Sequence, residues 1–358
     1  MSFFNRLKEQ LTLPFGPKMT ALGLHPQQTG DLETIVAKKV AKPKPADDEI
    51  LVRVLASSVN PVDVKMMAAY PLDGPFRTFG LDGLGEVVAR GKDVNNFEIG
   101  ERVFYVGQQR KPGADAEFEV VKADFAAQAP ANLSNTDAVA MPLTSVTAYD
   151  ILHQAFNLDV TANAASGKTL LIINGAGGVG SVLTQLAKYL GLTVITTAGN
   201  ADSKAWSKKM GADFVLDYHK SLTGQLEAIG HSQVDFIANL QDTAAYWDFM
   251  VQVLKPFGRI GAIVGTDENL PIGELKNMGA QFTWVFMLAR GNFDMHMEEQ
   301  GQILTGISAM LEQGVLHSTT TEVFDGFEPE SVQAAAQMLG QGHTYGKIVL
   351  NFNSEVGQ

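Results

Sequence analysis

One glycine-rich turn constrains the fold of this chain more than any other feature of its sequence. The four glycines Gly175, Gly177, Gly178 and Gly180 form the pattern G-x-G-x-x-G. A short apolar run, Leu170 to Ile173, precedes them and is typical of a strand buried on both faces. Apolar residues recur at helical spacing after them: Val179, Val182, Leu183, Leu186, Ala187 and Leu190. The order strand, tight turn and helix predicts a dinucleotide-binding unit.

Each glycine of this pattern has a physical role in such a unit. The first permits the sharp turn out of the strand, the second lets the backbone approach a pyrophosphate, and the third lets the helix pack closely on the strand. The phosphates then lie at a helix N-terminus, where free N–H groups favour negative charge. A plain glycine-rich loop is the alternative, but a second predicted strand at Thr193 to Thr197 favours the dinucleotide site. We expect contacts from Gly175, Ala176, Gly177, Gly178, Val179 and Gly180.

The end of the second strand bears on the choice of cofactor. An acid about 20 residues beyond the motif usually holds the ribose hydroxyls of NAD, but Gly199 stands there, followed by Asn200. An acid would repel a 2′-phosphate, so its absence predicts NADP(H). Lys204, Lys208 and Tyr218 are candidates to contact the phosphate, although a solvated helix face is the alternative for both lysines.

Strand and helix patterns alternate beyond this unit. Further strands are predicted at 214–216, 234–240, 259–264 and 281–286, at the spacing of βαβ units. Six strands make a doubly wound parallel sheet of the Rossmann type, with the cofactor across the carboxyl ends of the strands. Leu240 and Val264 end two of them and are therefore expected near the cofactor.

The first part of the chain reads as β-rich. Strands are predicted at 50–56, 83–89, 102–106 and 117–121, separated by Gly, Pro and Asp turns. We predict an N-terminal extension at 1–18, a β-rich domain at 19–143 and 288–358, and the cofactor domain at 144–287. In the extension, Phe3, Phe4, Leu7 and Leu11 form a short apolar helical face, expected to pack on the protein rather than on a partner or membrane.

Composition excludes several functional classes. The chain has 358 residues, 45% of them hydrophobic and 18% charged, as in a globular enzyme of two domains. A net charge of -12 argues against nucleic acid or an anionic membrane as the main partner. There are no cysteines, which excludes disulfides and thiolate metal sites. No membrane span or signal peptide is recognisable, so the expected location is the cytoplasm.

Several segments together resemble one family, the medium-chain dehydrogenase/reductase superfamily, and within it the zinc-free quinone oxidoreductase branch. The resemblance rests on SSVNPVDVKM (57–66), GLDGLGEVV (80–88), ERVFYVG (101–107), PGADAEF (112–118), MPLTSVTAYDIL (141–152) and the late HTYGKIVL. It covers nearly all of residues 19–352. It implies a GroES-like catalytic domain beside the Rossmann domain, with a small quinone or α,β-unsaturated carbonyl compound as substrate.

Related zinc alcohol dehydrogenases hold their catalytic metal with a Cys, a His and a second Cys. The matching positions here are Asn60, Leu81 and Leu143, none of which offers a thiolate or an imidazole. The seven histidines show no paired metal spacing. We therefore expect no metal, and hydride acceptors that need no Lewis acid.

The resemblance also implies roles for individual residues. Asn60 is expected to hydrogen-bond a substrate carbonyl. Asp63 and Lys65 are expected to orient the loop or the nicotinamide ribose. The alternative for Asp63 and Lys65 is an Asx turn before Pro61 followed by surface charges. Thr144 is expected near the carboxamide, or else as a helix N-cap. Lys347 matches basic residues near the adenosine phosphate. The pocket for the substrate ring is expected to have an apolar lining formed by Tyr70, Tyr105, Phe286 and Met287. The alternative for each of these residues is an ordinary place in the hydrophobic core.

The sequence thus predicts an NADPH-dependent quinone or enone oxidoreductase. A catalytically silent NADPH-binding or sensing protein of the same fold is the alternative, and a zinc alcohol dehydrogenase is disfavoured by the missing cysteines. We also expect a homodimer joined through the Rossmann domain, because strands 259–264 and 281–286 would leave an apolar sheet edge that pairing with a second copy covers.

Overall fold

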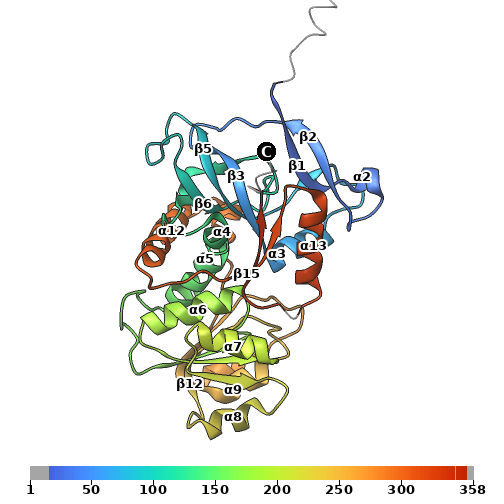
Figure 1. Ribbon diagram of the computed structural model, residues 1–358. Helices are drawn as coiled ribbons and strands as arrows, with labels where there is room; N and C mark the ends of the chain where they lie inside the picture. The colour runs from blue at the N-terminus through green and yellow to red at the C-terminus, as the bar shows by residue number, and fades with distance from the viewer. Residues whose placement is uncertain (1–15, 343, 353–358) are drawn as a thin grey trace, which may run out of the picture.

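The computed structural model describes residues 16–342 and 344–352 of the chain. Two bodies are stacked in it, a β-rich one that carries both ends of the described chain and a lower one built on a parallel sheet (Figure 1). The apolar face expected around Phe3, Phe4, Leu7 and Leu11 lies outside the described residues. Within the described residues, no helix is both long and apolar enough to cross a membrane.

The lower body contains the predicted six-stranded parallel sheet. Its strands, in spatial order, are β11 (Phe214–Asp217), β10 (Thr193–Ala198), β9 (Thr169–Ile173), β12 (Val234–Asn239), β13 (Leu254–Ala262) and β14 (Gln281–Trp284). The order reverses beside β9, which is the doubly wound arrangement predicted from the glycine turn. Two details of the sequence interpretation were wrong. β13 begins at Leu254 instead of at residue 259, and it is an interior strand, so only β14 forms that edge of the sheet.

Both faces of this sheet are buried, as the apolar strand sequences predicted. Leu170 and Ile172 of β9 belong to a core shared with α5 and α6, whereas Leu171 and Ile173 point into a second core with α8, α9 and α10. Alternate residues of a strand face opposite sides, so a strand covered by helices on both sides needs a continuous apolar run. The helices are α5 (Pro142–Asp150), α6 (Gly178–Tyr189), α7 (Ala201–Lys209), α8 (Leu222–Ala228), α9 (Trp247–Val253) and α10 (Gly273–Lys276).

The upper body is built on an antiparallel framework of short strands. They are β3 (Glu49–Val59), β5 (Asp82–Arg90), β6 (Arg102–Val106), β7 (Phe118–Lys122) and β8 (Ala126–Gln128), with a smaller sheet of β1 (Lys18–Leu24), β2 (Ile35–Ala41) and β4 (Arg77–Thr78). The alternating, turn-punctuated sequences predicted β3, β5, β6 and β7, whereas β1, β2, β4 and β8 were not predicted.

The late part of the chain returns to this framework, as predicted. β16 (Lys347–Asn351) pairs antiparallel with β3 and parallel with β15 (Thr320–Asp325). The remaining helices are α2 (Pro26–Thr29), α3 (Pro61–Ala68), α4 (Asn135–Val139), α11 (Ala289–Phe293), α12 (Met297–Glu312) and α13 (Pro329–Gly340). The turn between β9 and α6 meets the start of this returning segment, where Gly177 and Gly346 form an isolated parallel bridge.

Candidate active site

The glycine turn has the geometry that a dinucleotide requires. β9 ends at Ile173, and α6 begins at Gly178 with Gly177 as its N-cap, so the helix N-terminus opens at the carboxyl end of the central strand. Within the part of the chain that the structure describes, no side chain caps this helix. The first backbone N–H groups are thus available to an anion.

Three of the glycines are required by the protein itself. A Cβ on Gly175 would stand 2.4 Å from Cβ of Thr196, and one on Gly180 would stand 2.6 Å from the carbonyl oxygen of Asn174. A Cβ on Gly178 would stand 2.9 Å from the Lys347 stem. At Gly177 the nearest atom would be 3.4 Å away and the backbone φ is an ordinary -68°. Among the described residues, neither packing nor backbone conformation requires a glycine there.

The residues expected around the adenosine end lie together at the carboxyl ends of β10 and β11. A Cβ on Gly199 would overlap the phenol of Tyr218, at 2.2 Å from its oxygen, and Tyr218 is 46% exposed. Nζ of Lys204 is 2.9 Å from Oδ2 of Asp217, so part of its charge is already balanced. Asn200 caps α7 by accepting the N–H of Ser203 at 2.8 Å.

The other candidate cofactor contacts lie at opposite ends of the parallel sheet. Lys208 bonds the carbonyl oxygen of Asp213, which precedes β11, so it lies at the opposite end of the strand from Tyr218 and was wrongly grouped with Lys204. Leu240 and Val264 follow β12 and β13 at the expected sheet edge, where the Thr243 hydroxyl donates to the Val264 carbonyl at 2.6 Å.

The β-rich body contacts the glycine turn directly. The N–H of Gly346 donates to the carbonyl oxygen of Ala176 at 2.9 Å, and Gly177 and Gly346 form an isolated parallel bridge. Thr144 also lies here, because its Cγ2 would be 3.0 Å from a Cβ on Gly178. The Thr144 hydroxyl donates to the carbonyl of Ala140 at 3.2 Å, and Met141 occupies the N-cap, so the capping alternative for Thr144 was wrong.

A buried polar cluster lies where these elements meet. Asn60 is the N-cap of α3, and its backbone N–H donates to Oδ2 of Asp63 at 3.0 Å. Oδ1 of Asp63 accepts the N–H of Leu81 at 3.1 Å. Asp63 is 1% exposed, so the surface-charge alternative was wrong for it, whereas Lys65 is exposed on α3.

Asp82 is the central residue of the cluster, and the sequence interpretation missed it. It is fully buried, and its Oδ2 accepts from Ser58 Oγ at 2.6 Å and from Asn60 Nδ2 at 2.8 Å. Its Oδ1 accepts the N–H of Leu143 at 2.7 Å. The available signal was its place directly after Leu81, at the start of β5.

Lys347 supplies the positive charge of this cluster. Its ammonium donates to Oδ1 of Asn60 at 2.6 Å and to the Val59 carbonyl at 3.2 Å, and Oδ2 of Asp82 lies 3.3 Å away. Only 4% of Lys347 is exposed. The amide oxygen and nitrogen of Asn60 are therefore held by opposite charges, which fixes the orientation of its side chain.

The structure brings together the three positions matched to metal ligands. Asn60 and Leu143 both bond to Asp82, and Leu81 bonds to Asp63, which also holds Asn60. Their side chains are an amide and two alkyl groups. Among the residues that the structure describes, no group of three His, Cys, Asp or Glu could hold a metal ion.

Further buried acids lie behind the cluster. Asp115 accepts from Ser57 Oγ at 2.7 Å, and Glu119 accepts from the phenol of Tyr105 at 2.8 Å. Burial raises the pKa of Asp63 to about 7, and the neighbouring Asp82 charge adds to the shift. Burial likewise raises the pKa of Asp115 to about 8 and that of Glu119 well above its usual range.

These shifts predict that stability falls as pH rises. The folded protein keeps the proton on Asp63 from about pH 4 to about pH 7 and the proton on Asp115 from about pH 4 to about pH 8, whereas the unfolded chain releases both. Their contribution is complete below the unfolded pKa and is lost as pH rises through the folded pKa. Chemical denaturation across this range should show a declining free energy of unfolding. Asp115→Asn should flatten the decline, and the exposed control Asp93→Asn should not. A stability that rises with pH, or an unchanged slope in Asp115→Asn, would contradict the assignment.

The four residues expected to line the pocket for the substrate ring differ in their exposure to solvent. Tyr105 is completely buried in the core of the β-rich body, so it does not line an accessible pocket and that expectation was wrong. Met287 is buried and Phe286 is 51% exposed, while Tyr70 is half-buried with its hydroxyl on the Pro75 carbonyl. A small hollow of about 10 Å³, room for about one water molecule, is lined by Asp63, Met66, Thr78, Phe79, Gly80, Leu81, Gln108, Lys111 and Gly113.

Comparison with known proteins agrees with this architecture. Residues 46–131 match the alcohol dehydrogenase GroES-like domain, and residues 210–350 match the zinc-binding dehydrogenase family. A zinc-type alcohol dehydrogenase-like protein of Staphylococcus aureus is 40% identical over 311 residues, 87% of this chain and 92% of that protein.

Solved structures show the same fold. A candidate zinc-dependent alcohol dehydrogenase from Rhizobium etli is 31% identical with a TM-score of 0.88, covering 95% of this chain and 100% of that one. The quinone oxidoreductase of Coxiella burnetii is 26% identical with a TM-score of 0.75, covering 94% and 100% of the two chains.

The fold, the glycine turn and these matches define an oxidoreductase with a fold that binds nicotinamide cofactors. More closely, the chain belongs to the medium-chain dehydrogenase/reductase superfamily, together with the zinc-type alcohol dehydrogenase-like protein of Staphylococcus aureus.

Proposed function

We propose that this protein is an NADPH-dependent reductase of quinones or α,β-unsaturated carbonyl compounds that works without a metal. The observation that carries the proposal is the direct contact between the glycine turn and the Asn60 cluster through Gly346 and Lys347. A cofactor on the turn would lie beside a preorganised group of polar side chains. When bound, NADPH supplies the hydride and both electrons.

The cluster provides electrostatic stabilisation in place of a metal. Reduction of a conjugated carbonyl places negative charge on its oxygen, and fixed donors stabilise such charge most effectively where water is excluded. The Lys347 ammonium and the Asn60 amide are already oriented by Asp82 and are almost completely buried. Delocalised charge needs less stabilisation than a localised alkoxide, which favours quinones and enones over simple carbonyls.

A turnover screen tests the proposal. The purified protein should oxidise NADPH with small quinones, enals or enones and should not oxidise ethanol with NADP⁺. Elemental analysis should find no stoichiometric zinc, and chelators should leave the rate unchanged. Zinc at one equivalent, with activity lost on chelation, would support the zinc alcohol dehydrogenase instead.

One observation favours the second candidate, an NADPH-binding or sensing protein without turnover. Asn60 is only 1% exposed and both ends of its amide are engaged, so a substrate reaches it only if the cluster opens. Tight NADPH binding with no NADPH consumption across the acceptor panel would establish this alternative.

NADPH should bind more tightly than NADH. Gly199 carries no carboxylate that would repel a 2′-phosphate and packs against the exposed Tyr218, and Lys204 is at the same end of the sheet. A charge-assisted phosphate contact is worth roughly 1.5 to 3 kcal/mol, about tenfold to a hundredfold in affinity. Fluorescence titration should show this difference in the wild type and its reduction in Lys204→Ala. Lys208→Ala, on the same helix, is the control. Equal affinities for the two cofactors would refute the preference.

We also propose a homodimer joined through β14. This strand ends the six-stranded sheet, and its last residue, Trp284, is 47% exposed. An open edge with an exposed aromatic residue is a liability that pairing across a twofold axis removes. Light scattering at micromolar concentration should give twice the chain mass, and Trp284→Lys should shift it toward the monomer. A wild-type monomer would contradict the proposal.

A further inference from the structure

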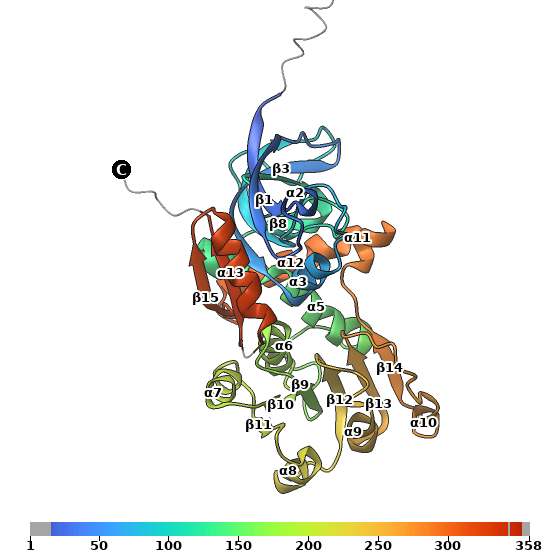
Figure 2. The same cartoon turned by 90° about the vertical axis from the view of Figure 1, so that its right-hand side faces the viewer.

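A hollow of about 540 Å³ lies apart from the candidate active site. It opens between α5 and α12, near the level at which the two stacked bodies meet (Figure 2). Its volume is typical of pockets that hold small molecules. Its described lining comes from α5 and the segment after it, from α11 and from α12, and not from the polar cluster or the glycine turn. That segment starts with a π-helical turn, η2 (Ile151–Ala155), a rare kind of turn that is frequent at functional sites.

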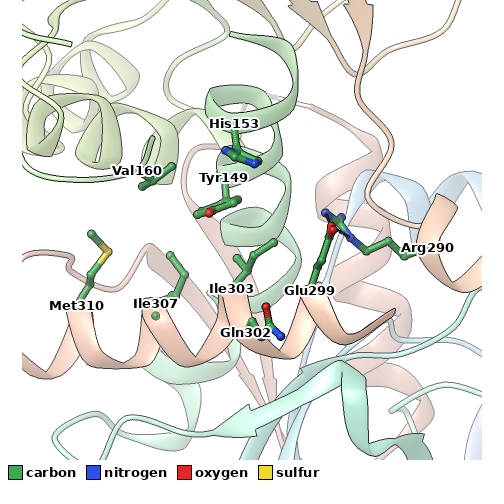
Figure 3. Close-up of a pocket in the computed structure, with 10 residues that line it drawn as sticks. Tyr149, His153, Val160, Arg290, Glu299, Gln302, Ile303, Ile307 and Met310 are labelled. Atoms are coloured by element: carbon green, nitrogen blue, oxygen red, sulfur yellow. Dashed lines mark hydrogen bonds and ion pairs between the residues drawn. The ribbon is translucent and has the colours of Figure 1, made fainter. Parts of the chain in front are cut away.

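The lining of this hollow is ionic at one end and apolar at the other. Arg290 and Glu299 lie at the ionic end (Figure 3). Val160, Ile307 and Met310 lie at the apolar end, where each is buried or half-buried. An occupant that matches this lining therefore has one polar end and an apolar body.

The ionic end has one more negative charge than positive charge. The Arg290 guanidinium bonds both carboxylate oxygens of Asp150, at 2.6 and 2.9 Å, and Oε2 of Glu299 at 3.0 Å. Two carboxylates thus share one cation. The other oxygen of Glu299 lies 3.4 Å from Nδ1 of the exposed His296, and the Glu299 side chain is 45% exposed. Its carboxylate can therefore accept a further donor from the hollow.

Tyr149 lines the hollow between its two ends (Figure 3). Burial raises the pKa of its phenol, and the charges of Asp150, Asp159 and Glu299 raise it further, whereas Arg290 lowers it. The ring thus lies among three carboxylates and one guanidinium. Negative surroundings and an aromatic face both attract a cation.

Gly306 leaves part of the hollow open. It lies in the interior of α12, where glycine is less favourable than alanine. Among the described residues, no atom would lie within 4 Å of a Cβ at this position. Gly301 on the same helix differs, because its Cβ would stand 2.7 Å from the carbonyl oxygen of Asp124. Packing therefore explains Gly301 but not Gly306, whose missing side chain would extend into the hollow.

We infer that this hollow binds an amphipathic organic cation, a protonated amine attached to an aromatic or aliphatic group. The ammonium group donates to Glu299 and lies against the Tyr149 ring, while the apolar group covers Ile307 and Met310. An anion in the same place meets the excess negative charge, and a neutral molecule gains only the apolar contacts. The site is separate from the proposed reductase reaction and does not depend on it.

The experiment measures the binding of three probes that share a phenylalkyl body and differ in their polar group: phenylbutylamine, phenylbutanol and phenylbutyrate. Calorimetric titration of the full chain at neutral pH should show that the amine binds about threefold to fivefold more tightly than the alcohol, as for a partly exposed ion pair. The carboxylate should bind more weakly than the alcohol. A wild-type protein that does not bind the amine, or that binds amine and carboxylate equally, would overturn the inference.

Glu299→Gln tests the excess charge, with Glu298→Gln as its control. Glutamine still offers an oxygen to Arg290, so the variant removes the charge and keeps the hydrogen bond. The preference for the amine over the alcohol should disappear in this variant. It should persist in Glu298→Gln, which changes an exposed residue of the same turn outside the lining. A preference that survives Glu299→Gln would contradict a cation site at this end of the hollow.

Gly306→Leu tests the place of binding, with Gly306→Ala as its control. The leucine side chain fills the hollow, and its Cβ meets no described atom within 4 Å, so the protein should stay folded and lose measurable binding of the amine. Alanine leaves most of the hollow free and should keep the affinity near the wild-type value. Thermal melting followed by circular dichroism verifies that both variants are folded. Unchanged binding of the amine by folded Gly306→Leu would place the cation elsewhere and refute the site, whatever the protein does with NADPH.

Discussion

Gly177→Val should abolish binding of the nicotinamide cofactor while the protein stays folded. The site of the missing Cβ is open on the protein side, with no atom closer than 3.4 Å, and the backbone φ of -68° suits any residue. The branched side chain would instead occupy the space through which the pyrophosphate approaches the helix N-terminus. We expect a loss of more than about a hundredfold in affinity, roughly 3 kcal/mol, by calorimetric titration with NADPH.

Gly180→Ala is the matched control for this variant. Its Cβ would stand 2.6 Å from a backbone oxygen of the same turn, so the expected effect is on thermal stability, whatever the ligand. A folded Gly177→Val protein that binds NADPH normally would show that the cofactor does not lie on this turn.

Lys347→Met should be the most destabilising single substitution at the site. It leaves the Asp82 carboxylate, which is fully buried, without its cation. Removing one partner of a buried ion pair costs about 3 to 5 kcal/mol, because the remaining charge is uncompensated. Chemical denaturation should show this loss. The exposed pair Arg53–Glu86, on neighbouring strands, provides the control, and Arg53→Met should cost at most about 1 kcal/mol.

The double variant Lys347→Met, Asp82→Asn separates charge from packing. A neutral amide at position 82 no longer needs a cation and still offers an oxygen to the Leu143 N–H. The double variant should therefore be more stable than Lys347→Met alone. If the stability losses of Lys347→Met and Asp82→Asn simply add in the double variant, the methylene stem of Lys347 stabilises the site and its charge does not.

The cofactor domain was predictable because local patterns determine it. The apolar run of β9 has to be buried on both faces, and the glycine turn admits few conformations, so strand order and ligand position follow from general rules. The early start of β13 at Leu254 was missed because an apolar residue between a helix and a strand fits either pattern.

The polar cluster was only partly predictable because its contacts are long-range. Asp82 meets Asn60, Leu143 and Lys347, which are 22, 61 and 265 residues away in the chain. The periodicity of apolar residues along the sequence gives no information about such long-range contacts. Tyr105 was misjudged for a similar reason, because its partner Glu119 lies on a different strand, inside the core.

The contact between Gly346 and Ala176 joins two segments that are synthesised at different times. The glycine turn, with its strand and helix, leaves the ribosome long before the segment that contains Gly346 and Lys347. Until that segment arrives, Asp82 and Asn60 lack their cation, and the carbonyl of Ala176 lacks its partner. The segment around the glycine turn can fold early, but the polar cluster is complete only after Lys347 has been synthesised.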